Sequence, residues 1–258
     1  SEQGIGDTIQ FARYIFYIEK KFDCKIYFYV NKKYLHLFNN CPFNIISDLK
    51  NIDTIDYYQY LMSLQRIYFK ENNNFFKNIN YINTNKDLDN VWKNKINKMK
   101  KPVIALNWQG NPKYTEDHLR SIPLEYFTNI VKNKKYNFIS LQKGYGSDQI
   151  KNNNLSSYIN DISYQIDLDG DVFVDTISIL KNIDLLITTD TAIAHLAGTM
   201  EINTFLLLNY NPEWRWVIET NKKIFYNKKL IIIQQTKYND WQSVVNKLNK
   251  KLDNFFNK

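Results

Sequence analysis

One stretch, residues 184–208, constrains the fold of this chain more than any other. It reads DLLITTDTAIAHLAGTMEINTFLLL: an apolar run at 185–187, a polar turn at 188–191, an alanine-rich helix that carries His195, and a second apolar run at 204–208. The order of strand, loop, helix and strand is typical of a parallel sheet whose strands are joined by helices.

The helix that begins in this stretch is a candidate anion site. The first turn of a helix has backbone N–H groups without intrahelical partners, and the positive end of the helix dipole lies there. With Asp190, Thr191 and His195 beside the end of the preceding strand, the pattern predicts a phosphate-binding crevice. The same residues allow an alternative, in which Thr191 only caps the helix and His195 is a packed histidine with satisfied hydrogen bonds.

The rest of the second half follows the same alternation. We expect strands at 103–108, 137–142, 184–188, 204–208 and 230–234, a weaker strand at 164–168, and helices at 124–132, 173–181, 192–200 and 240–252. Strands that alternate with helices predict the α/β class and a doubly wound parallel sheet.

The first half is less regular. We expect a helix at 7–21, a strand at 25–30, a helix at 32–38, a strand at 43–46 and a helix at 86–97, with 55–68 ambiguous and the asparagine-rich segment 72–85 in a loop. The charged run 98–102 ends in a proline that disfavours helix before it. This linker divides the chain into an N-terminal domain at 1–98, a C-terminal domain at 103–238 and a closing helix at 239–258.

Composition excludes several classes of protein. A chain of 258 residues with 44% hydrophobic content can bury sizeable cores. The net charge of +8 and the pI of 9.1 raise the question of nucleic acid or an anionic membrane. However, the lysines accompany abundant asparagine, isoleucine and tyrosine, which A/T-rich codons encode, and pairs such as Lys20 and Lys21 lie among acidic and polar neighbours. Solvated surfaces explain the charge better, and we expect no nucleic-acid partner.

Cysteine content and hydropathy point to a cytoplasmic protein. Cys24 and Cys41 have neither a metal-binding nor a redox spacing, and two cysteines are too few for a disulfide framework. No apolar run approaches the roughly 20 residues that span a bilayer, and the first residues lack the basic and apolar regions of a signal peptide.

The opening segment offers a second candidate site. Gly4-Ile5-Gly6-Asp7 leads into a helix, but Ile9 stands where a dinucleotide fingerprint needs glycine or alanine. Asp7 and Gln10 have the spacing of a capping box, so Asp7 has a purely structural explanation. The functional alternative is a general base on a glycine loop that lets substrate approach the backbone closely.

Six segments together resemble one known family. They are EQGIGDTIQFARY at 2–14, NWQGNP at 107–112, RSIPLEYF at 120–127, SLQKG at 140–144, DTAIAHLAG at 190–198 and NPEWRW at 211–216. In this order they resemble the glycosyltransferase domain found behind tetratricopeptide repeats in bacterial proteins, which is related to the heptosyltransferases of glycosyltransferase family 9. The resemblance covers nearly the whole chain.

The resemblance implies a GT-B architecture, with two Rossmann-like domains facing across a cleft, the donor nucleotide in the C-terminal domain and the acceptor mainly in the N-terminal one. It implies that Asp7 is the catalytic base and that Asp190, Thr191 and His195 surround the donor diphosphate. Without a built-in metal or other cofactor, Arg120 or Lys143 would supply positive charge, although each has a surface salt bridge as its alternative. Further donor contacts are implied at Asn111, Ser121, Gln142 and Ala192.

The expected reaction is metal-independent, inverting transfer of a sugar from a nucleotide-diphosphate donor to a hydroxyl of a carbohydrate or protein acceptor. The helix near Thr191 would stabilise the departing diphosphate. Aromatic residues are expected to wall the cleft, with core packing as the alternative for each: Trp108, Tyr210, Trp214 and Trp216.

The sequence also departs from the family. Ser1 stands where a glycine is usual, and the strand that precedes the glycine loop in the family is absent from the sequence, so we expect an N-terminal domain that lacks its first strand and has an unpaired sheet edge. Tetratricopeptide repeats are absent from it as well. Two other functions stay open: a non-catalytic fragment that binds nucleotide or carbohydrate, and a GT-B nucleotide-sugar epimerase.

Overall fold

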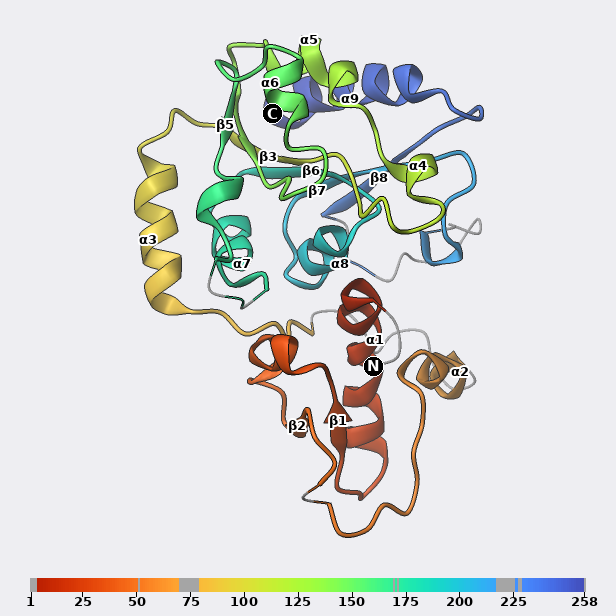
Figure 1. Cartoon of the computed structure of the whole chain (residues 1–258). Coiled ribbons are helices and arrows are strands. Elements are labelled where there is room, and N and C mark those ends of the chain that lie inside the picture. Colours follow the sequence, from red (N-terminus) through yellow and green to blue (C-terminus); the bar gives the residue numbers. More distant parts are fainter. Residues whose placement is uncertain are drawn as a thin grey trace.

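The larger unit of the molecule is built on one parallel sheet. The computed structural model describes residues 4–50, 52–69, 79–168, 170, 172–216, 226 and 229–257. Six strands lie in the order β5-β4-β3-β6-β7-β8 (Figure 1). Their bounds are β3 Val103–Asn107, β4 Asn137–Ser140, β5 Ile159–Asp161, β6 Leu185–Thr189, β7 Thr204–Leu208 and β8 Leu230–Gln234. The chain builds outward from β3 to β5, then returns to the other side of β3 with β6, so the strand order reverses between β3 and β6.

Helices cover both faces of this sheet. On one face lie α5 (Thr128–Val131), α6 (Gln149–Asn152), α9 (Trp241–Phe256) and the 3-10 helix η3 (Leu124–Phe127); on the other lie α7 (Val174–Leu180) and α8 (Ala192–Thr199) (Figure 1). The alternation along β3 explains the two layers. Ile104 and Leu106 belong to the core beneath α9, whereas Val103 and Ala105 belong to the core beneath α7 and α8. The expected doubly wound α/β fold is therefore confirmed for this half of the chain.

The smaller unit contains α1 (Ile5–Lys21) and a two-stranded parallel sheet of β1 (Tyr27–Tyr29) and β2 (Asn44–Ile46). Short helices complete it: the 3-10 helices η1 (Lys32–Phe38) and η2 (Leu61–Ser63), and α2 (Leu64–Phe69). The long helix α3 (Lys86–Asn97) then runs beside α7 and leads into the large sheet (Figure 1).

The helix α1 joins the two units. Ile9, Phe11 and Ala12 are fully buried, and they share one continuous core with Leu196 and Ala197 of α8. Phe28 and Phe38 of the small unit belong to the same core. The amino-terminal end of α1 consequently lies against α8, close to the ends of β6 and β7 (Figure 1).

Several elements differ from the expectation. The strand predicted at 164–168 is wrong: the strand is β5, and Ser163–Gln165 forms the 3-10 helix η4. Asp167 explains the difference, because it has a positive φ of 51° and its carboxylate accepts hydrogen bonds from the backbone N–H groups of Asp175 and Thr176 at the start of α7. A residue that caps a helix in this way cannot continue a strand.

Other differences concern type and length. The helix predicted at 32–38 is 3-10 throughout, the one at 124–132 divides into η3 and α5, and the ambiguous segment 55–68 contains η2 and most of α2. The strands expected at 25–30 and 43–46 shorten to three residues each. Half of the loop predicted at 72–85, residues 72–78, lies outside the described residues, and the other half, 79–85, contains no helix or strand, as expected.

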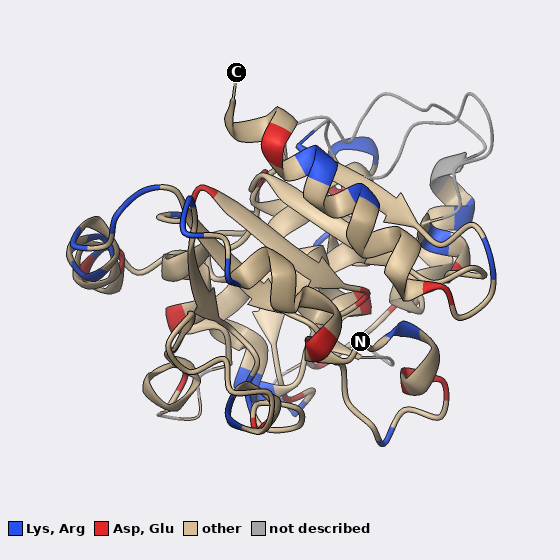
Figure 2. Cartoon of the chain, turned by 90° about the horizontal axis from the view of Figure 1, so that it is seen from above, with Lys and Arg blue, Asp and Glu red and all other residues tan. Residues whose placement is uncertain are grey.

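Charge and hydropathy of the described residues agree with the composition. Lysine and arginine positions are spread over several elements in Figure 2 and do not form a single patch there. Among the described helices, none combines the length and the apolar character that crossing a membrane requires.

Candidate functional site

The site begins at the reversal of strand order. The side chain of Asn107, the last residue of β3, accepts hydrogen bonds from the hydroxyls of Thr188 at 3.2 Å and Thr191 at 2.9 Å, both on the β6 side. In open parallel sheets, ligands bind outside the carboxyl ends of the strands at such a reversal. Asn107 therefore fixes the spacing of the two strands at the position where a crevice is expected.

The helix α8 starts at this crevice. Thr191 has an extended backbone and precedes the first helical residue, Ala192, yet its side chain does not cap the helix. Its hydroxyl donates to Asn107 instead. Thr191 is therefore the N-cap by position only, because its hydroxyl does not occupy the N–H groups of the first turn.

Asp190 lies between the end of β6 and α8. It is only 7% exposed and lines a pocket of about 210 Å³. Burial raises the pKa of its carboxyl, and the positive charges of Arg120 and Arg215 oppose that rise. The pocket thus combines a largely buried carboxyl with the guanidinium group of Arg120, and the charge of Arg215 acts on Asp190 from outside the pocket lining.

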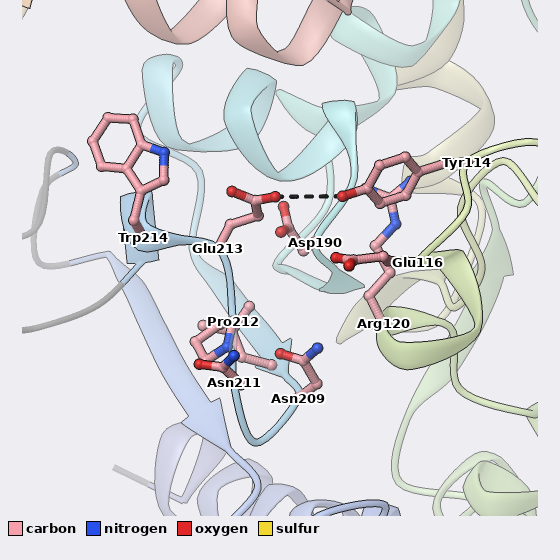
Figure 3. Close-up of a pocket in the computed structure, with 10 residues that line it drawn as sticks. Tyr114, Glu116, Arg120, Asp190, Asn209, Asn211, Pro212, Glu213 and Trp214 are labelled. Carbon is pink, nitrogen blue, oxygen red and sulfur yellow. Dashed lines mark hydrogen bonds between the residues drawn. The ribbon is translucent and has the colours of Figure 1, made fainter.

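Two segments form the walls of this pocket (Figure 3). Tyr114, Glu116 and Arg120 come from the loop and helix after β3 and face Asp190 from one side. The other side is the segment that leaves β7, which contributes Asn209, Asn211, Pro212, Glu213 and Trp214. Leu208, the last residue of β7, also lines the pocket. The Tyr114 hydroxyl donates to Glu213 at 3.4 Å and joins the two walls. Of the aromatic residues expected at the cleft, Trp214 lines this pocket.

Arg120 is held in place by Asp117, on the short helix α4 (Asp117–Arg120). Its Nε donates to Asp117 Oδ1 at 2.9 Å, and its guanidinium lies 4.7 Å from the centre of the Tyr114 ring. The Ser121 hydroxyl donates to the other oxygen of Asp117 and accepts from the N–H of Gly110. A Cβ at Gly110 would lie 2.2 Å from Asp117 Oδ1. Ser121 therefore helps to hold Asp117, which in turn holds Arg120. The salt bridge that was the alternative for Arg120 does exist, between Arg120 and Asp117 beside the pocket.

Three other predicted donor contacts do not line the pocket. The buried amide of Gln142 is engaged with backbone groups of Trp108, Gln109 and Tyr145. Lys143 Nζ donates to the carbonyls of Ile166 and Asp167. Asn111 accepts from the N–H of Lys113 in a local turn. Each of these three side chains is bonded to backbone groups, and none of them belongs to the pocket lining.

Two of the predicted cleft aromatics lie elsewhere as well, and Trp216 is buried. Trp108 is 1% exposed and belongs to the core between the sheet and α9, as the packing alternative holds. Tyr210 is exposed, and its backbone N–H is bonded to Gln235, but it does not line the pocket. Trp216 is buried against His195, with ring centroids 4.8 Å apart.

His195 lies behind the start of α8, one turn into the helix. It is 4% exposed, its Nδ1 is 2.9 Å from the Tyr226 hydroxyl, and its Nε2 is 4.0 Å from Asp190 Oδ1. Burial lowers its pKa well below the usual range, and the charges of Arg215, Arg13 and Arg120 add to this effect. The imidazole is therefore neutral and already has one partner.

Asp7 reaches the same region from the other end of the sequence. It is the third residue of α1, and Gly4 rather than Asp7 is the N-cap. The capping box expected from Asp7 and Gln10 is therefore wrong. The carboxylate of Asp7 is 2.6 Å from Arg215 Nη1. Burial raises its pKa, and Arg215 opposes the rise.

The contact that brings Asp7 to α8 requires a glycine. A Cβ at Gly6 would lie 2.9 Å from Cδ2 of His195 and 3.4 Å from the backbone of Ala192. The Gly-Asp pair and the helix with His195, which the sequence analysis identified separately, are therefore neighbours in space. Ala192 takes part in this contact through its backbone.

Arg215 is the residue that sequence reasoning missed. Its guanidinium pairs with Asp7 and lies 3.8 Å from Glu213, so it connects α1 to the pocket wall. An arginine in a short 3-10 helix (η5, Trp214–Trp216) produces no periodic pattern. The sequence feature that could have pointed to Arg215 is its position in the segment NPEWRW, one of the six that resemble the family.

Comparisons with known proteins give one match. The sequence matches no family model and no curated protein. Among solved structures, the chain is similar to E. coli ADP-heptose lps heptosyltransferase II, with 13% sequence identity and a TM-score of 0.43. The match covers 66% of this chain and 53% of that one, so this chain spans about half the length of the structure it matches.

Proposed function

We propose that this protein is a glycosyltransferase that moves a sugar from a nucleotide-diphosphate donor to a hydroxyl of a carbohydrate or protein acceptor, without a metal and with inversion. One observation carries the proposal. Asp7, from the start of the chain, and the opening turn of α8 meet at the reversal of strand order, with Arg215 paired to Asp7 beside the pocket. The six sequence segments that resemble family 9 supply the reaction class.

Asp7 would act as the general base. It would take the proton of the acceptor hydroxyl while that oxygen forms a bond to the anomeric carbon and the bond to the diphosphate breaks. Burial raises the pKa of Asp7, which increases its basicity, because a base works best when its pKa approaches the working pH. Attack from the side opposite the diphosphate gives inversion.

The departing diphosphate would be bound by the first turn of α8 together with Arg120 and Arg215. Backbone N–H groups and the helix dipole favour an anion there, and a guanidinium matches the geometry of phosphate oxygens. The carboxylates of Asp190 and Glu213 would repel a diphosphate. We therefore assign them to hydroxyl groups of the sugar or the ribose.

A second candidate is a protein that binds the nucleotide without transfer. The observation that favours it is the ion pair between Asp7 and Arg215. A carboxylate in an ion pair can serve to hold the two elements together without acting as a base. In that case the parent would bind the nucleotide without transferring a sugar, and Asp7→Asn would alter only the ion pair with Arg215.

The experiment that separates the two is sugar transfer from UDP-, GDP- and ADP-linked donors by the parent and by Asp7→Asn. For a general base, we expect turnover to fall by about two to four powers of ten while nucleoside-diphosphate affinity changes little. Asp53→Asn, on an exposed segment of the same unit, is the matched control. Transfer by Asp7→Asn at the parent's rate would reject Asp7 as the base, and the absence of transfer by the parent would favour binding alone.

A further inference from the structure

A cluster behind the start of α8 holds the His195 ring on two sides. Trp216 stacks on the imidazole with an interplanar angle of 19°, and the hydroxyl of the buried Tyr226 is 2.9 Å from Nδ1. The helix is adapted to this arrangement. A Cβ at Gly198 would lie 2.6 Å from Cγ and Cδ1 of Tyr226, so the ring packs against α8 only because position 198 is glycine.

The two nitrogens of His195 face different partners. Nδ1 faces the Tyr226 hydroxyl, and Nε2 is 4.0 Å from Asp190 Oδ1. A neutral imidazole has a single N–H. If Nε2 lacked the proton, its lone pair would face a carboxylate oxygen, whereas a proton on Nε2 makes that contact attractive. The proton therefore belongs on Nε2, which leaves Nδ1 as the acceptor.

The charges around the cluster agree with this assignment. The guanidinium of Arg13 lies 4.4 Å from the centre of the Tyr226 ring. Burial raises the pKa of the Tyr226 hydroxyl, and the charge of Arg13 opposes the rise, so the hydroxyl keeps its proton and can donate it in a hydrogen bond. Arg215, Arg13 and Arg120 together disfavour a second proton on His195. Asp190 is the carboxyl that faces the ring, and it does so at Nε2.

We propose that Tyr226 is a positioning residue: its hydroxyl donates to Nδ1 of His195 and fixes the Nε2–H tautomer, with that N–H directed at Asp190 and the first turn of α8. Which nitrogen carries the proton in a histidine is set by the hydrogen bond that the other nitrogen makes. The use of this N–H, as a donor to the diphosphate, rests on the proposed function. The tautomer itself does not.

The tautomer can be measured directly. The chain has three histidines, so a His36→Gln/His118→Gln variant leaves His195 as the one imidazole in a ¹⁵N NMR spectrum. We expect a pyrrole-type shift at Nε2 and a pyridine-type shift at Nδ1 at neutral pH. A pyrrole-type shift at Nδ1, or two pyrrole-type shifts from an imidazolium, would overturn the proposal even if no further variant folds.

Tyr226→Phe in that background tests the role of the hydroxyl. It removes one oxygen and keeps the ring that packs on α8, and we expect the single tautomer to give way to a mixture. Tyr238→Phe, at an exposed tyrosine, is the matched control and should leave the spectrum unchanged. An unaltered tautomer in Tyr226→Phe would show that Tyr226 does not set it.

Titration with pyrophosphate, UDP and ADP connects the tautomer to the site. We expect Tyr226→Phe to bind the best of these ligands about tenfold more weakly, the effect of roughly one neutral hydrogen bond. Equal affinity in Tyr226→Phe and the parent would overturn the positioning role. If the parent shows the Nε2–H tautomer but binds none of the three, the proposed function fails while the assignment of the tautomer stands.

Discussion

The two units of the molecule differ in how they hold their part of the site. The large unit places Asp190 and the start of α8 on a six-stranded parallel sheet with a core on each face. The small unit has two three-residue strands and exposes Tyr57 and Tyr58 almost fully. Asp7 is therefore positioned by the packing of α1 on α8 and not by a sheet of its own. The proposed donor side is built on the large sheet, whereas the proposed base depends on the packing of α1 against α8 and on its ion pair with Arg215.

The largest effect is expected where α1 joins the shared core. Phe11→Ala removes a fully buried ring and should lower the free energy of unfolding by about 3–5 kcal/mol. Because the core is continuous, far-UV and near-UV circular dichroism should report the same transition. Phe22→Ala, at the exposed C-cap of the same helix, should change stability by about 0.5 kcal/mol or less. Separate transitions for the two units would show that they do not share one cooperative core.

The next effect concerns the donor side alone. Arg120→Gln removes the guanidinium from the pocket, and we expect nucleoside-diphosphate affinity to fall by about 1.5–3 kcal/mol, the usual contribution of a charged hydrogen bond. Lys143→Gln removes the same charge at a position where Nζ binds the carbonyls of Ile166 and Asp167, and affinity should stay near that of the parent. Calorimetric titration of both variants measures the two affinities. Equal losses would show that the diphosphate does not bind in the pocket beside Arg120.

The pH dependence of stability tests the burial of His195. Its native pKa is depressed below the ordinary 6.5, so the unfolded chain takes up this proton first as the pH falls. The stabilisation that comes from the neutral, buried imidazole is fully present above about pH 6.5. Below that pH, the free energy of unfolding should decrease by up to about 1.4 kcal/mol per pH unit. Asp7 and Asp190 act in the opposite sense nearer pH 4, because burial raises their pKa values.

Urea unfolding of the parent and of His195→Gln between pH 7 and 5.5 isolates the contribution of His195. The difference between the two proteins should shrink as the pH falls. A difference that does not change with pH would mean that the pKa of His195 is the same in the native and the unfolded protein, as for a solvated imidazole, and a difference that grows as the pH falls would mean that native His195 is already protonated.

The smallest effect is expected at the link between β3 and α8. Thr191→Val removes the hydroxyl that donates to Asn107 and should cost about 0.5–1.5 kcal/mol of stability. Thr128→Val is the matched control, because its hydroxyl donates to a carbonyl at an exposed position. A loss at Thr191 no greater than at Thr128 would show that the crevice does not depend on this bond.

The sequence predicted the large sheet well because its strands are buried on both faces and read as apolar runs. It missed β5, whose three residues include Asn160 and Asp161 and give no such run. Asp7 and Asp190, which the structure brings to one region, were chosen from the sequence because each carboxyl stands at the boundary of an element. Gln142 and Trp108 show the limit of that reasoning, since their neighbours from other strands, invisible in the sequence, decide that they are structural.

Under the proposed function, a donor diphosphate lies at the first turn of α8 where α1 meets it. A crystal structure of the protein with whichever of UDP, GDP or ADP binds it tests this most directly. We predict phosphate oxygens within hydrogen-bonding distance of the backbone N–H groups of Thr191 or Ala192 and of the Arg120 guanidinium. Phosphates bound away from this turn, for example beside Lys143, would contradict the claim.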